Sequence, residues 1–286
     1  MMRGMQNDFS RPLAVMAIVN RTPDSFYDKG KTFALDAAVA AGAAAFEAGA
    51  TIVDVGGVKF APGPAVAIED EIALVVPVVR ELALLGDVSV DTFHPAVARA
   101  AIEAGAAIIN DTTGLRDPQM ADVVADSEAR IVIAHSLATP RTQHPLPHYD
   151  DVTAEVGAFL RQRSDLALGR GIPAERIIID PGHDLNKNTL QTLEITRRLD
   201  EIAAIGFPLL VALSNKDFIG EALGRERDQR VAGSLAAAVF CVLHGASIVR
   251  AHNVPESVDA LRMVESILGW RVPENLVHNM RAEGND

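Results

Sequence analysis

A short segment recurs three times along the chain, and it restricts the possible folds more than any other feature. The copies begin Glu-Ala-Gly-Ala at residue 47, Glu-Ala-Gly-Ala at residue 103 and Leu-His-Gly-Ala at residue 243. Each reads as a helix end, a glycine suited to the left-handed position after a helix, an aliphatic run and a polar residue. Aliphatic runs without alternation are typical of parallel strands buried on both faces. The repeat therefore predicts helices that alternate with parallel strands.

Five further aliphatic stretches read as strands, which brings the expected total to eight. They are residues 13–19, 88–91, 130–135, 176–180 and 209–213. Amphipathic stretches rich in Ala or Leu lie between them, for example residues 35–48, 152–168 and 190–204. Eight strands alternating with helices favour a closed α/β architecture, the (β/α)₈ or TIM barrel, over an open doubly wound sheet.

The 286 residues fit one such barrel, since this fold typically takes about 250 residues. No linker or low-complexity segment interrupts the pattern. We therefore expect one domain over residues 11–272, with an N-terminal tail at 1–10 and a C-terminal tail at 273–286.

Charge and composition exclude several classes of partner. The formal net charge of −12 argues against nucleic acid and anionic membranes, because both favour basic surfaces. No apolar run approaches the roughly 20 residues that a membrane span needs, and the N-terminus lacks the apolar centre of a secretory signal. The one cysteine, Cys241, lies in an apolar helical stretch and is expected to be a buried structural thiol. A cytoplasmic protein is the expectation.

Polar side chains follow the aliphatic strands where each strand ends. In a barrel these ends line one bowl, which is where active sites lie. A single polar residue at a strand end is more often a cap, but convergence from all strands predicts a ligand site. The residues are Asn20, Asp54, Asp91, Asn110, His135, Asp180, Ser214, Arg250 and His252.

The motifs at these strand ends resemble those of the dihydropteroate synthases, a family of pterin-binding barrels. The resemblance rests on Asn-Arg-Thr-Pro-Asp-Ser-Phe from residue 20, Asp-Val-Gly-Gly from 54, Asp-Pro-Gly from 180 and Ser-Asn-Lys from 214. It extends from about residue 13 to residue 270. It implies the transfer of hydroxymethyl-dihydropterin from its pyrophosphate to p-aminobenzoate in folate biosynthesis, with Mg²⁺ as cofactor and a homodimeric assembly.

The resemblance assigns five residues to the pterin: Asp91, Asn110, Asp180, Lys216 and Arg250. Their chemistry agrees, because carboxylates accept from the amino and N–H groups of a pterin and an amide both donates and accepts. Lys216 can donate to the carbonyl or a ring nitrogen, and the Arg250 guanidinium can stack on the ring. The alternative is a purely structural ion-pair network of Asp91, Asp180 and Lys216.

The pyrophosphate is assigned to Asn20, Arg250 and His252, with Asn20 also a ligand of Mg²⁺. A neutral amide oxygen suits a hard, water-rich Mg²⁺ site. The structural alternatives are that Asn20 caps the loop after the first strand and that His252 is a core histidine bonded to a carbonyl.

The chain departs from the family pattern on the side away from the pterin. The family loop Gly-Gly-Glu-Ser-Thr-Arg-Pro-Gly is replaced from residue 56 by Gly-Gly-Val-Lys-Phe-Ala-Pro-Gly. Phe60 thus replaces a hydroxyl and Ala61 replaces a bidentate arginine. Lys59 adds a positive charge nearby, but a point charge does not reproduce a planar fork.

The loops that follow the first, sixth and seventh predicted strands also differ from the family pattern. Where the family has Gly-Ile-Gly-Phe-Gly-Lys-Thr, this chain reads Gly-His-Asp-Leu-Asn-Lys-Asn from residue 182, which places Asp184 and Leu185 at the p-aminobenzoate side. Asn215 replaces an arginine, and Arg21 replaces an apolar residue. Asp184 is expected to disfavour an anionic benzoate.

These departures favour a dihydropteroate synthase-like paralogue that keeps the pterin pocket but has little or no synthase activity. Other hypotheses stay open: an active synthase that uses Lys59 and Arg21, a transferase with another acceptor, or a binding protein that is either a ligand sensor or a partner for an active synthase. The expected ligands are a pterin and p-aminobenzoate or its sulfonamide and sulfone mimics. His144 and His148 are expected on a surface excursion rather than at a metal site.

Overall fold

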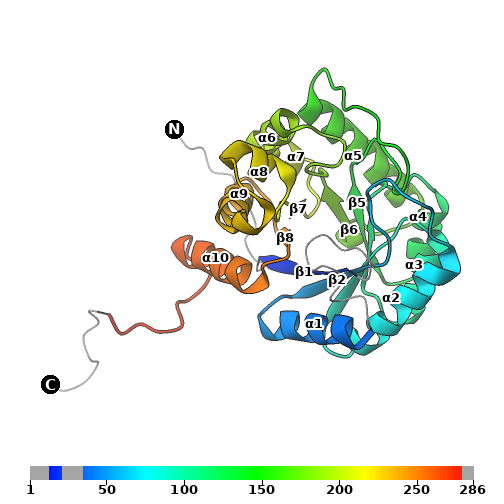
Figure 1. The fold of residues 1–286 in the computed structure, drawn as a ribbon, viewed down its shortest axis with the longest axis horizontal. Coiled ribbons are helices and arrows are strands. Elements are labelled where there is room, and N and C mark those ends of the chain that lie inside the picture. The colour runs from blue at the N-terminus through cyan, green and yellow to red at the C-terminus, as the bar shows by residue number, and fades with distance from the viewer. Residues whose placement is uncertain (1–12, 21–34, 279–286) are drawn as a thin grey trace.

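The computed structural model describes residues 13–20 and 35–278, and its centre is an eight-stranded parallel sheet ringed by helices (Figure 1). The sheet order is β6-β5-β4-β3-β2-β1-β8-β7, and a bridge between Ile179 and Leu209 joins its two ends. The predicted single TIM barrel is thereby confirmed. The strands are β1 (Ala14–Asn20), β2 (Ile52–Gly56), β3 (Asp87–Asp91), β4 (Ile108–Asp111), β5 (Arg130–Ala134), β6 (Ile177–Asp180), β7 (Leu210–Ala212) and β8 (Ile248–Ala251).

The helices follow the predicted pattern with one difference. The expected helix over residues 190–204 is divided at Arg198, whose backbone leaves the helical region at φ −107° and ψ 28°. The Arg198 guanidinium bonds Asp151, Glu194 and Glu201 at this break. The α-helices are α1 (Leu35–Glu47), α2 (Ile68–Leu82), α3 (Pro95–Glu103), α4 (Gln119–Ala125), α5 (Val152–Gly169), α6 (Thr189–Arg197), α7 (Leu199–Ala203), α8 (Asp217–Leu223), α9 (Val231–Leu243) and α10 (Val254–Ile267), and the 3₁₀ turns are η1 (Ala174–Arg176) and η2 (Arg227–Gln229).

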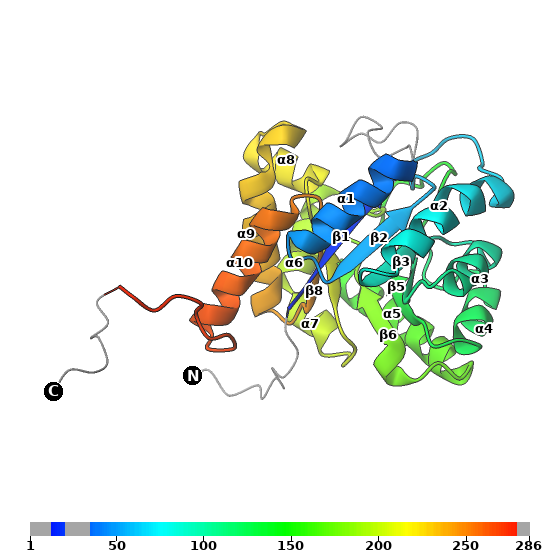
Figure 2. The same cartoon turned by 90° about the horizontal axis from the view of Figure 1, so that it is seen from below.

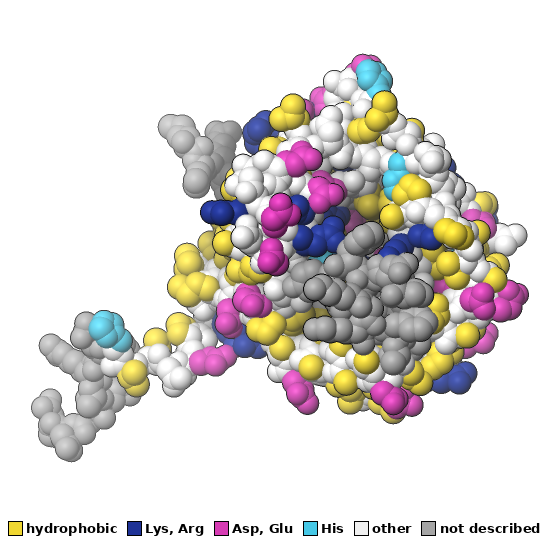
Figure 3. Space-filling model, in the orientation of Figure 1, with side chains coloured by type: hydrophobic (Ala, Val, Ile, Leu, Met, Phe, Trp, Pro, Cys, Tyr) yellow, Lys and Arg dark blue, Asp and Glu magenta, His cyan; other side chains and the backbone are white. Residues whose placement is uncertain are grey.

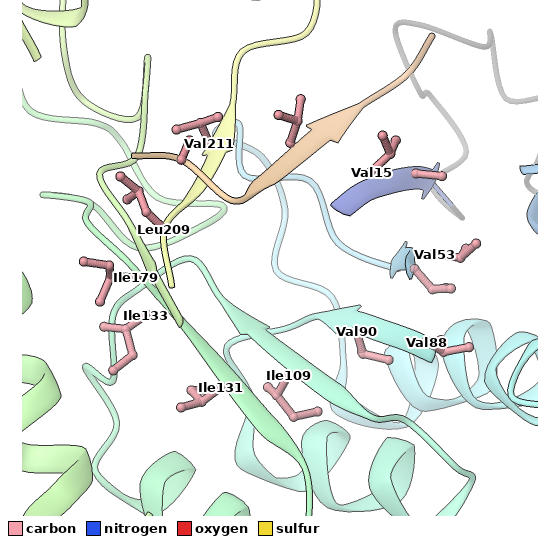
Figure 4. Close-up of a cluster of buried hydrophobic side chains, with 14 of the residues drawn as sticks. Val15, Val53, Val88, Val90, Ile109, Ile131, Ile133, Ile179, Leu209 and Val211 are labelled. Atoms are coloured by element: carbon pink, nitrogen blue, oxygen red, sulfur yellow. The ribbon is translucent and has the colours of Figure 1, made fainter. Parts of the chain in front are cut away.

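Successive residues of the strands face two different apolar layers. The outer layer lies between the barrel and its helices, and Figure 4 shows part of it, including Val53, Val90 and Ile109. The inner layer fills the barrel itself with Met16, Ile52, Ile108, Val132, Ile178, Leu210, Ala212 and Ile248. This alternation with a period of two explains why the strands read as continuous aliphatic runs.

The same alternation places the polar strand ends inside the barrel. Asp54, Asn110, Asp180 and Arg250 each come two residues after a member of the inner layer, so their side chains project into the same space, one layer nearer the C-terminal end of the barrel. The strand register agrees, since Asp91 pairs with Gly56 on one side and with Asn110 on the other. The predicted polar bowl therefore forms.

The C-terminal segment lies apart from the barrel, and the one thiol is buried within it. After α10, residues 271–278 lead away from the barrel (Figure 2), while the expected N-terminal tail lies outside the described residues. Cys241 is free and buried in α9, and burial raises the pKa of its thiol to about 12, which makes it unreactive. Over residues 13–20 and 35–278, no helix is both long and apolar enough to cross a bilayer.

Candidate functional site

A cavity of about 350 Å³ opens at the C-terminal end of the barrel. Figure 3 shows the molecule in the orientation of Figure 1, with several Lys and Arg side chains near the centre of the view. The predicted residues on the cavity wall are Asn20, Lys59, Phe60, Ala61, Asp91, Asp184, Leu185, Asn215, Lys216, Arg250 and His252. Two others, Asn110 and Asp180, are buried behind that wall, with exposed fractions of 3% and 5%. The structure thus brings the predicted set together.

Asp54 holds the floor of the site together, although the predicted pterin set did not include it. It is fully buried, and its Oδ2 accepts hydrogen bonds from Asn110 Nδ2 at 3.2 Å and Arg250 Nε at 2.7 Å. Arg250 Nη2 also reaches Asp91 Oδ2 at 3.3 Å. Strands β2, β3, β4 and β8 are therefore joined by one charged network. Asp54 could have been included from the sequence, because it stands at the end of a predicted strand.

Two acceptor atoms of this network are buried without a partner. Neither Asp54 Oδ1 nor Asn110 Oδ1 has a hydrogen-bond partner in the part of the chain that the structure describes. A buried acceptor left in this state costs about 1–3 kcal/mol. A ligand that brings N–H donors to these oxygens would recover that free energy, so the floor is chemically suited to a donor-rich ring edge.

The carboxylates of the site have unusual proton affinities. Burial raises the pKa of Asp91 to about 7; Arg250 opposes this shift, whereas Asp54, Glu71 and Asp111 add to it. Burial also raises the pKa of Asp180, against the opposing charge of Lys216. Asp180 Oδ1 accepts from the backbone N–H of Gly182 at 2.7 Å, which fixes its orientation.

Lys216 and His252 are positioned by the loops that follow β7 and β8. Lys216 Nζ donates to the backbone carbonyl of His183, and burial lowers the pKa of this amine, against the charges of Asp184 and Asp180. His252 contacts Ser214 Oγ at 3.2 Å, both through Nδ1 and through its backbone N–H.

The loop after β2, which contains Lys59, Phe60 and Ala61, is held by the loop after β5. Arg141 donates from Nη1 to Ala61 O at 3.0 Å and from Nε to Pro64 O at 2.9 Å. His144 Nε2 lies 3.3 Å from Phe60 O, and the two rings are 4.9 Å apart. The Pro-rich loop is thus more than the surface excursion we expected, although His148 is exposed.

The loop after β6 has several residues with positive φ, the conformation that glycine favours, although its sequence is altered. Gly182, Asp184 and Asn186 all have positive φ, at 67°, 61° and 52°. Asp and Asn tolerate this region better than other residues with side chains. The residues that replace two family glycines therefore fit the left-handed backbone of this loop.

Side-chain hydrogen bonds hold that loop in place. Asp184 Oδ2 accepts from Phe218 N at 3.2 Å, in the first turn of α8, and its Oδ1 accepts from Thr192 Oγ1 at 3.2 Å. Asn186 Oδ1 accepts from Ser136 Oγ and Ala138 N, both at 2.9 Å. The charge of Asp184 is therefore directed at a helix N-terminus, which weakens its expected effect on an anionic benzoate.

Asn215 does not supply the positive charge of the arginine that the family has at this position. It is buried at φ 58°, and its Nδ2 donates to Asn253 Oδ1 at 3.1 Å. A cation that sequence reasoning missed, Arg227 of η2, lines the cavity instead. The sequence did not indicate that Arg227 lines the site, because this residue follows α8 and not a strand.

The geometry of β1 to β3 brings together two side-chain oxygens suited to Mg²⁺. A Cβ built on Gly56 would lie 3.6 Å from Asn20 Oδ1 and 4.0 Å from Asp91 Oδ2, so the glycine leaves space between two oxygen ligands. Mg²⁺ commonly takes one or two protein oxygens and completes its shell with phosphate and water, so these residues fit it. The described ranges hold no cluster of three or more His, Cys, Asp or Glu suited to a metal. Arg21 and its motif lie outside them.

Comparison with known proteins agrees with this geometry. The family described as pterin binding enzyme matches residues 16–252. The chain belongs to the dihydropteroate synthase family. Inactive dihydropteroate synthase 2 of Mycobacterium leprae is 42% identical, over 94% of this chain and 97% of that protein.

Relatives whose names do not include the word inactive are nearly as similar. Dihydropteroate synthase of Escherichia coli is 39% identical, over 93% of this chain and 95% of that protein. The structure of Xanthomonas albilineans dihydropteroate synthase with 4-aminobenzoic acid superimposes with a TM-score of 0.84, at 42% identity over 93% of this chain and 95% of that one. Proteins named as inactive and proteins named simply as dihydropteroate synthases are therefore about equally similar to this chain.

The left-handed backbone at Asn186 predicts an unusual order of stabilities. Asn186→Gly removes two hydrogen bonds and is expected to cost about 1–2 kcal/mol of unfolding free energy. Asn186→Ala removes the same bonds and adds about 1–2 kcal/mol of left-handed strain. Urea unfolding of the three proteins measures both. Equal stability of the Gly and Ala variants would show that the loop leaves this conformation.

The raised pKa of Asp91 predicts a pH-dependent stability. The folded protein keeps this proton between the ordinary pKa of 3.8 and about 7, where the unfolded chain has released it. Protonation of Asp91 therefore stabilises the folded state fully below pH 3.8. This stabilisation declines as the pH rises and is lost above about 7. Denaturant titrations of wild type and Asp91→Asn across this range should diverge accordingly. Parallel curves would contradict the shift.

Proposed function

We propose that this member of the family binds a pterin at the floor of the barrel mouth. The observation that carries the proposal is the pair of unpartnered buried oxygens, Asp54 Oδ1 and Asn110 Oδ1, in the network that Arg250 extends to Asp91. The pyrimidinone edge of a pterin offers an amino group and ring N–H donors, which such oxygens accept. Lys216 would donate to the ring and the Arg250 guanidinium would stack on it.

The pyrophosphate of the substrate would bind in the same cavity. Asn20, Arg250 and His252 line it, and they supply an amide oxygen, a guanidinium and an imidazole. Asn20, with Asp91 beside Gly56, would hold Mg²⁺, which neutralises the charge that develops on a departing pyrophosphate. The roles of Asn20, Arg250 and His252 follow the family pattern, while Asp91 is added because of its place beside Gly56.

We further propose that synthase turnover is low. Phe60 and Ala61 line the cavity where the family has a hydroxyl and an arginine, and Arg141 holds their loop against the loop after β5. Losing one electrostatic stabiliser of a transition state typically costs about 10²–10³ in rate. The name of the Mycobacterium leprae relative supports this view, while the similarity to the Escherichia coli synthase makes the alternative, an active synthase, a real competitor.

An assay of pyrophosphate release with both substrates separates the two. We expect less than about one hundredth of the rate of the Escherichia coli enzyme under the same conditions. The double variant Phe60→Thr, Ala61→Arg restores the family residues and should raise turnover by about tenfold or more. A wild-type rate equal to that of the Escherichia coli enzyme would refute low activity, and so assign the chain to the active synthases.

A homodimer through α9 and α10 is part of the proposal. These helices pack side by side (Figure 1), and α9 carries no charged side chain. Both expose large apolar residues, with Leu243 57%, Met263 59% and Ile267 70% exposed. An apolar face of this kind on two neighbouring helices is typical of an interface.

The substitution Leu243→Glu tests this surface. A charge placed in an apolar interface is expected to weaken it by about tenfold or more, and so to yield monomers in sedimentation analysis at micromolar concentration. The control is Leu190→Glu, which changes another exposed leucine, on α6, and should leave assembly unchanged. A wild-type protein that sediments as a monomer would remove the proposal.

A further inference from the structure

A second cavity, of about 390 Å³, opens beside the loops that follow β3, β4 and β5. Phe93 and His94 line it from the first of these loops, Thr113 and Arg116 from the second and Thr139 from the third. Among the described residues, it shares no lining residue with the cavity at the barrel mouth. Loops that follow the strands of a barrel carry its ligand sites, so this cavity lies at the functional end of the fold.

The imidazole of His94 is held in one orientation. Its Nδ1 lies 2.8 Å from Oε2 of Glu71, a side chain of α2 that is fully buried. The backbone N–H of His94 donates to Thr92 Oγ1 at 3.2 Å, and the ring centroids of His94 and Phe93 are 4.0 Å apart. Since Nδ1 faces a carboxylate, Nε2 is the ring nitrogen available to a ligand, and no residue that the structure describes bonds it.

The loop after β4 is fixed by a buried carboxylate of its own. Asp111 accepts from Thr113 N, Thr113 Oγ1 and Leu115 N, at 2.8, 2.6 and 2.8 Å. Leu115 is buried at φ 58°, a conformation that leucine rarely adopts. Strained residues of this kind persist only where surrounding contacts enforce them, and they cluster at functional sites. The segment that carries Thr113 and Arg116 is therefore preorganised.

The polar groups of this cavity favour a phosphate monoester over a carboxylate. The planar guanidinium of Arg116 matches two oxygens of either anion. The neutral imidazole of His94, with its proton on Nδ1 towards Glu71, offers a lone pair at Nε2. A phosphate monoester is partly protonated near neutral pH, so it can donate an O–H to that nitrogen, whereas a carboxylate has no proton to donate.

Two further features of the lining bear on the ligand. Asp117 brings a negative charge, but its Oδ1 accepts from Gln119 N at 2.9 Å and the residue is exposed, so solvent and salt screen it. Phe93 and Pro118 give the cavity an apolar surface of the kind that packs against a flat ring. The ligand that fits is a phosphate carried on an aromatic group.

We propose that this cavity is a second ligand site, which binds an aromatic phosphate monoester. The phosphate lies between Arg116 and His94, and the aromatic group packs against Phe93. The second site does not rest on the proposed pterin site, because the two cavities have separate linings within the described ranges.

Calorimetric titration of phenyl phosphate into the full-length protein tests the second site. We expect one binding event that Arg116→Gln weakens by about tenfold. Arg99→Gln, which removes the same charge from an exposed position on α3, should match wild type. Phe93→Leu should weaken phenyl phosphate by about threefold or more and leave inorganic phosphate unchanged, because only the first has a ring to pack. Benzoate should bind wild type at least about tenfold more weakly than phenyl phosphate.

The second site is overturned if phenyl phosphate fails to bind wild type at millimolar concentration, if wild type and Arg116→Gln bind it equally, if Arg99→Gln shows the same loss, or if benzoate binds as tightly. Loss of binding in His252→Ala but not in Arg116→Gln would place the phosphate in the barrel-mouth cavity, and so would also reject the second site. Affinity for 6-hydroxymethylpterin is measured separately and should be unchanged in Arg116→Gln. Failure of that pterin to bind wild type would reject the proposed function and leave the second site standing.

Discussion

The contact between Arg250 and Asp54 is the interaction on which the site depends. A guanidinium inside a barrel mouth loses most of its hydration, so it needs anionic partners to remain charged there. Asp54 Oδ2 supplies one at 2.7 Å and Asp91 Oδ2 a second at 3.3 Å. Asn110 then donates to the same oxygen of Asp54, which leaves one oxygen of each residue available as an acceptor. The shape of the floor follows from these bonds.

The fold was predictable because its signals are local. Helix ends, glycines and aliphatic runs repeat along the chain, and the strands they predict agree with the structure to within about two residues. The polar strand ends were predictable for the same reason. The central role of Asp54 was not, because its contacts with Arg250 and Asn110 depend on the register between strands that are distant in sequence.

Loop conformation was the harder part of the prediction. Asp184 and Asn186 read as bulky replacements of glycine, yet both adopt the left-handed backbone and bond neighbouring elements. Their tolerance of positive φ is a known property, but the partners Phe218 and Ala138 are visible only in three dimensions. Arg227 was missed because a residue on a short turn after a helix carries no strand-end signal. The break at Arg198 was likewise hidden by a continuous amphipathic pattern.

The inner and outer halves of the cavity have therefore diverged differently. The floor carries residues that the family resemblance assigns to the pterin, joined by a charged network, whereas the walls carry the substituted side chains Phe60, Ala61, Leu185 and Asn215. This division is the basis of the proposal that the chain binds a pterin with altered chemistry at its pyrophosphate and acceptor.

Calorimetric titration of 6-hydroxymethylpterin into wild type and Asn110→Ala tests the central claim most directly. The account predicts binding of one pterin per chain to wild type, weakened by about tenfold or more when the Asn110 amide is removed. Absence of binding to wild type at millimolar ligand, or equal affinity of the two proteins, would contradict it.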